Sequence, residues 1–151
     1  MSLQDLASLS TALSGIGVIF TVVYAALQIR NNTREVRATA FQQVVNSFAA
    51  ISFDIAKDRT LSDLYLRGGR DIKALDDVEH AQYMFMLLSF LRRAESVFFQ
   101  TETHMLHEQH WFGIRESTKA VMATPGARAC WAEIRTRFNP QFATFVDELA
   151  G

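Results

Sequence analysis

Three histidines recur at every third position in the stretch HMLHEQH, where the residue types are suited to metal chemistry. His104, His107 and His110 stand near the carboxylates of Glu102 and Glu108, and imidazole together with carboxylate suits zinc or iron. On a helix this spacing spreads the imidazoles over about 120°, which is tolerable for one metal ion but not ideal. HEQH is also one residue short of the zincin pattern H-E-x-x-H. We interpret the stretch as a polar turn and predict no metal and no cofactor, with a metal- or haem-binding membrane enzyme as the alternative.

A second candidate is Glu95, which lies at helical spacing with the apolar residues around it in FLRRAESVFFQ. A carboxylate on an apolar face must be paired or neutralised, because burying it alone is unfavourable. Arg92 is one turn away, and Arg128 or Arg135 from a C-terminal helix are further candidate partners. We expect a buried ion pair that fixes helix register; a proton-accepting or ligand-binding group is the alternative.

The segment PGARACWAEIRTRFNPQF places aromatic, cationic and thiol groups together. Arg128, Trp131 and Arg135 are spaced for one helix face, and Trp131 with Arg135 could form a cation–π contact. Cys130 has no base at helical spacing and is interpreted as a small buried apolar residue. The sequence contains no G-x-S-x-G, Walker or paired C-x-x-C motif, so we predict that the protein is not an enzyme.

Composition excludes some classes of protein. The chain has 151 residues and a formal net charge of −1, which argues against a sequence-independent nucleic-acid binder. One cysteine excludes an internal disulfide. All fifteen lysines and arginines lie at or after Arg30, so charge is distributed unevenly along the chain.

The charge-free stretch from Leu6 to Ile29 has 24 residues. As a helix it would be about 36 Å long, enough to cross a hydrocarbon core of about 30 Å. A signal peptide would need a basic start, which MSLQDL lacks. We therefore predict a transmembrane helix within residues 1–30 and a cytoplasmic helical domain over residues 31–151.

Orientation in the membrane follows from Arg30, Arg34 and Arg37, which directly follow the apolar stretch. The positive-inside tendency places this end in the cytoplasm and the short N-terminus outside, so we expect a single-pass protein of the inner membrane. The three arginines are a solvated flank, or they bind lipid headgroups.

The predicted span has a face of small and polar residues at alternating spacings of three and four. In lipid, small residues that permit close backbone approach mark the contact face between helices. We expect self-association, or docking onto a larger membrane complex, through this face; a homo-oligomeric pore lined by it is the alternative. The residues are Ala7, Ser10, Ser14, Gly17, Thr21, Tyr24 and Gln28.

The rest of the chain has helical periodicity without alternating strand patterns. An amphipathic helix over 33–57 can be continuous with the span. A short helix should stop at Gly68 and Gly69, and a core helix should begin at Asp76 or Asp77. Further helices are expected over 108–123, from Pro125 to Phe138 and from near Pro140. The predicted class is all-α: one membrane helix and a small helical bundle.

The chain resembles a family of small, largely uncharacterised bacterial single-pass membrane-anchored proteins. The resemblance rests on VVYAALQIRNNTREVRA after the apolar start, FLRRAESVFFQ in mid-chain and TPGARACWAEIRTRFNPQF near the end. It covers most of the chain in order and implies a bacterial inner-membrane location. It implies no catalytic residues.

Overall fold

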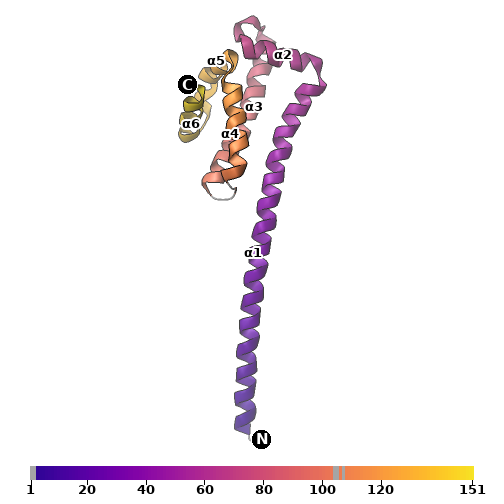
Figure 1. Cartoon of the computed structure of the whole chain (residues 1–151), viewed down its shortest axis with the longest axis vertical. Helices are drawn as coiled ribbons and strands as arrows, with labels where there is room; N and C mark the ends of the chain where they lie inside the picture. Colours follow the sequence, from indigo (N-terminus) through magenta and orange to yellow (C-terminus); the bar gives the residue numbers. More distant parts are fainter. Residues whose placement is uncertain (1–2, 104–105, 107) are drawn as a thin grey trace. The chain divides into compact units, whose positions relative to one another are not determined.

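A computed structural model describes the backbone of residues 3–103, 106 and 108–151, and their side chains except those of residues 3, 5–13, 108 and 110. Most of the described residues are helical, and none of them belongs to a strand (Figure 1). The α-helices are α1 (Leu3–Lys57), α2 (Arg59–Arg70), α3 (Asp77–Glu102), α4 (Glu108–Met122), α5 (Pro125–Ile134) and α6 (Pro140–Ala150), with short 3₁₀ helices η1 (Ile72–Ala74) and η2 (Arg135–Arg137).

The chain forms two compact units, Met1–Thr39 and Ala40–Gly151. Helix α1 is continuous across the boundary between them. The first unit is helical throughout its described part, and the second unit contains the C-terminal part of α1 with all the following elements.

The transmembrane prediction is wrong for the described part of the chain, where no helix is both long enough and apolar enough to cross a membrane. The charge-free run with described side chains extends from Ser14 to Ile29, which is 16 residues. That length of helix rises about 24 Å, short of a core of about 30 Å. It also includes polar residues and ends at Arg30. The predicted inner-membrane location and orientation are withdrawn with the span; residues 6–13 lie outside the described side chains.

Polar side chains cap the N-termini of α2, α3, α5 and α6. Asp76 accepts hydrogen bonds from the first turn of α3, and the Glu79 carboxylate accepts one from the Asp76 backbone N–H, which completes a capping box. Thr124 caps α5 with Pro125 at its first position, and Asn139 caps α6 in the same way. The predicted helix from Pro125 to Phe138 ends at Ile134 and continues as η2.

Helices α2 and α5 meet where Gly126 packs against Gly68. The prediction that Gly68 and Gly69 stop α2 is wrong, because these two residues lie inside that helix. A Cβ on Gly68 would overlap the ring of Tyr83, and a Cβ on Gly126 would overlap the carbonyl oxygen of Gly68. The glycines therefore permit close packing between helices and do not terminate one.

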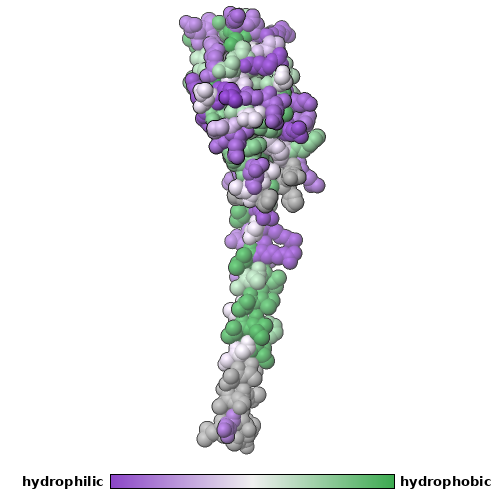
Figure 2. Space-filling model, turned by 90° about the vertical axis from the view of Figure 1, so that its left-hand side faces the viewer, coloured by the Kyte–Doolittle hydropathy of each residue, from purple (hydrophilic) through white to green (hydrophobic). Residues whose placement is uncertain are grey.

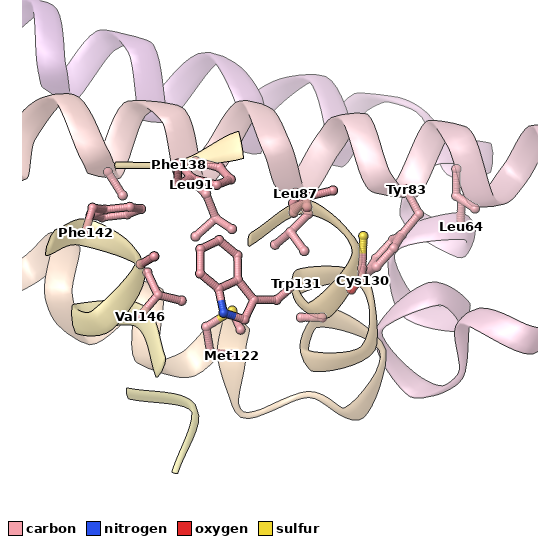
Figure 3. Close-up of a cluster of buried hydrophobic side chains, with 14 residues drawn as sticks. Leu64, Tyr83, Leu87, Leu91, Met122, Cys130, Trp131, Phe138, Phe142 and Val146 are labelled. Carbon is pink, nitrogen blue, oxygen red and sulfur yellow. The ribbon is translucent and has the colours of Figure 1, made fainter. Parts of the chain in front are cut away.

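The main core of the second unit lies among α2, α3, α4, α5 and α6 (Figure 3). Leu91 of α3, Met122 of α4 and Phe142 of α6 are fully buried and meet in it. Helix α4 packs against α3 and α6, while α2 packs against α3 and α5. Burial of these large apolar side chains is the main source of stability for the unit.

A smaller apolar cluster brings the C-terminal part of α1 into the second unit. Val44 of α1 packs with Val97 of α3 and Leu106. Phe48 of α1 meets Phe90 of α3 edge to face, with ring centroids 5.4 Å apart. The amphipathic pattern predicted over 33–57 thus places apolar residues of α1 against α3.

Candidate functional site

Residues 14–29 of α1 carry an exposed apolar surface. Ile16 is 52% exposed, Phe20 71% and Leu27 53%, and the apolar stretch of the helix is visible in Figure 2. With about 100° of rotation per residue, the large apolar side chains cover about two thirds of the helix circumference. The remaining sector holds Ser14, Gly17 and Thr21. A contiguous apolar surface of this kind marks an interaction site. The other large apolar side chains exposed here are Val18, Ile19, Val22, Val23, Tyr24 and Ile29.

The predicted small-residue face is present on this segment. Ser14, Gly17, Thr21, Tyr24 and Gln28 are exposed at alternating spacings of three and four. The side chains of the two further predicted members, Ala7 and Ser10, lie outside the described residues.

Two local features suit this face to close, dry packing. A Cβ added at Gly17 would meet nothing within 4 Å, so the backbone there is open to a neighbour. The Thr21 hydroxyl donates a hydrogen bond to the Gly17 carbonyl oxygen at 2.8 Å. That donor is satisfied within the helix and needs no water.

Arg30, Arg34 and Arg37 are exposed on α1. Their spacing places them on one side of the helix. Nothing in the structure tests the headgroup role predicted for them, which stays a prediction.

Glu95 is mostly buried, with 13% of its side chain exposed. Its Oε2 accepts a hydrogen bond from Arg92 at 2.7 Å, and its Oε1 accepts one from the backbone N–H of Asn139 at 2.8 Å. Arg92 also donates to the Arg137 carbonyl at 2.6 Å and stacks over the Phe138 ring at 4.4 Å. These contacts hold residues 137–139, which precede α6, against α3. We therefore assign Glu95 a structural role.

The other two predicted partners of Glu95 interact elsewhere. Arg135 forms an ion pair with Asp147 of α6 at 2.6 Å, and Trp131 donates its indole N–H to the same carboxylate at 2.9 Å. In place of a cation–π contact, Trp131 and Arg135 therefore share one acceptor. Arg128 donates to the carbonyl oxygens of Met122 and Ala123 at the end of α4.

The shared contacts stabilise the charged form of the Asp147 carboxylate. The Arg135 hydrogen bond, helped by that of Trp131, holds the pKa of the Asp147 carboxyl below its usual value. Sequence reasoning missed Asp147 because it is 16 residues from Trp131, beyond any spacing rule for one helix.

The remaining chemical candidates offer no assembled site among the described residues. No group of three or more His, Cys, Asp or Glu there is arranged to hold a metal ion. His104, His107 and the side chain of His110 lie outside the described residues. Cys130 is buried, and burial raises the pKa of its thiol to about 11, so the nucleophilic thiolate is scarce at neutral pH.

Comparisons with known proteins give no family. No protein-family model matches the chain, and neither curated proteins nor solved structures give a match. The family resemblance based on the three sequence segments stays a prediction.

Proposed function

We propose that the chain is a non-enzymatic interaction module that self-associates through residues 14–29 of α1. The observation that carries the proposal is the run of large apolar side chains exposed on this segment to either side of its small-residue face. A wide exposed apolar surface marks an interaction site, so these side chains need a partner surface.

The small-residue face contains a glycine that lacks a close contact within the chain. A glycine inside a helix costs about 1 kcal/mol relative to alanine. Gly68 and Gly126 offset this cost through close packing within the chain. Gly15 and Gly17 have no such contact. Of the two, Gly17 lies among the small residues of the proposed face, where close approach of a second helix would offset its cost.

A second copy of the chain is the partner that fits this surface by symmetry. Each copy carries the same small-residue stripe flanked by the same large apolar side chains, so one two-fold axis buries both surfaces together. Docking onto a different subunit is the other outcome that the experiment below can give. The predicted pore required a membrane span and is not proposed here.

Sedimentation velocity of the full chain tests the proposal with a matched pair of variants. Gly17→Leu blocks close approach on the proposed face. Gly15→Leu makes the same chemical change about 160° away around the helix, because two residues correspond to about 200° of rotation. A Cβ at either glycine meets nothing within 4 Å, so neither variant strains the chain itself.

We expect the wild type and Gly15→Leu to form the same oligomer, and Gly17→Leu to dissociate at least tenfold more readily. A monomeric wild type, or equal effects of the two variants, would contradict the proposal. A wild-type monomer that gains mass only with a co-purified subunit would favour docking onto another protein instead.

A further inference from the structure

The second unit contains an apolar cavity of about 620 Å³ that the self-association does not use. Its walls come from residues 41–56 of α1, residues 83–90 of α3 and residues 113–121 of α4, with Tyr65 of α2 beside them. The volume lies within the range of about 300 to 1,000 Å³ typical of small-molecule sites.

The lining offers almost nothing to a polar or charged ligand. No lysine, arginine, aspartate or glutamate contributes to it. The Ser52 hydroxyl donates to the Phe48 carbonyl at 3.3 Å, and the Ser117 hydroxyl donates to the Gly113 carbonyl at 2.8 Å. The Tyr83 hydroxyl is engaged with Thr124. A polar group placed inside would lose its hydration without gaining partners.

An extended peptide would place backbone N–H and C=O groups against walls that offer them almost no partners. A hydrocarbon chain has no such groups. It is narrow, it can bend with the walls, and it gains dispersion contacts with the aromatic rings of Phe41, Phe48 and Phe90 that line the cavity.

We propose that this cavity binds one elongated aliphatic chain, of the kind carried by fatty alcohols and fatty acids. The chain lies among α1, α3 and α4, and its polar head remains at the mouth of the cavity. The binding is a property of the second unit and goes beyond self-association.

Isothermal titration calorimetry of the full chain with hexanol, octanol, decanol and dodecanol tests the proposal. Affinity should rise by about tenfold for each pair of added methylenes until the cavity is full. The terminal diol of decane should bind at least tenfold more weakly than decanol, because one hydroxyl would be buried. Absence of binding, or affinity independent of chain length, would overturn the proposal.

Two variants at Gly113 locate the binding. A Cβ at this cavity-lining position meets nothing within 4 Å, so Gly113→Phe occupies the cavity without a backbone clash, while Gly113→Ala leaves most of it free. We expect Gly113→Phe to lose at least tenfold in decanol affinity and Gly113→Ala to bind like the wild type. Val45→Trp narrows the cavity from α1 and should repeat the loss. If Gly113→Phe and Val45→Trp both keep the circular dichroism spectrum of the wild type and bind decanol unchanged, the assignment of the binding site to this cavity is wrong.

Discussion

Helices α2 and α5 pack backbone to backbone where Gly126 lies on the carbonyl of Gly68. A methyl group added at Gly126 would overlap that carbonyl oxygen and approach Gly69 as well. A backbone carbonyl cannot rotate away as a flexible side chain can, so the two helices must separate. Gly126→Ala therefore tests whether this contact positions α5 and its buried residues.

The expected cost follows from two opposing effects. Overpacking in a close-packed interior costs about 1 to 3 kcal/mol, while replacement of glycine by alanine in a helix returns at most about 1 kcal/mol. We expect Gly126→Ala to lower the free energy of unfolding by about 1 to 2 kcal/mol. Gly113→Ala makes the same change in α4, where the added Cβ would meet no atom within 4 Å. This variant should raise the free energy of unfolding by about 0.5 to 1 kcal/mol.

Urea denaturation followed by tryptophan fluorescence measures both changes. Trp111 lies in α4 and Trp131 in α5, so the signal reports on the second unit. A Gly126→Ala variant at least as stable as the wild type, with an unchanged denaturant slope, would refute the reasoning about the glycine contact.

Two further predictions concern titratable groups. Because the folded-state pKa of Asp147 is lowered, its stabilisation is present above the unfolded pKa of about 3.9 and is lost as pH falls through the folded pKa. Asp147→Asn should therefore destabilise the chain by about 1 kcal/mol at pH 7, and the difference in urea midpoint from wild type should shrink below about pH 4; a difference independent of pH would contradict the assignment. Cys130, with a thiol pKa of about 11 and no exposed surface, should resist iodoacetamide at neutral pH and react rapidly only in denaturing urea. Equal labelling rates by mass spectrometry in the two conditions would contradict its burial.

Local sequence signals gave most of the helix positions. Caps such as Asp76 and Thr124, and prolines at first helical positions, act within one turn, so their helices begin where the sequence predicts. The charge-free run over residues 6–29 led to the prediction of a membrane span, which is wrong in the described part of the chain. The length of a charge-free run does not measure its hydropathy. Gly68 was misread because a helix stop and a close helix contact both favour glycine; the difference depends on Gly126, more than fifty residues later.

Of the two surfaces that carry the proposals, only one could be predicted from the sequence. Spacing along one helix identified the stripe that includes Ser14, Gly17 and Thr21, because its members share a face regardless of tertiary structure. The cavity was not identified, since it depends on how α1, α3 and α4 pack. Its sequence signal is weak: Gly113 and Ser117 leave one face of α4 without bulk opposite the aromatic residues of α1 and α3.

Cysteine crosslinking at Gly17 tests the central claim of self-association most directly. A disulfide requires Cα atoms within about 7 Å of each other, a separation reached only if the small-residue faces of two copies meet. In a Cys130→Ser background, mild oxidation should convert Gly17→Cys to a covalent dimer and leave Gly15→Cys monomeric. Equal crosslinking at both positions, or none at either, would contradict the account. A wild type that stays monomeric, and whose residues 14–29 become protected from amide hydrogen exchange only when phospholipid vesicles are added, would also contradict it.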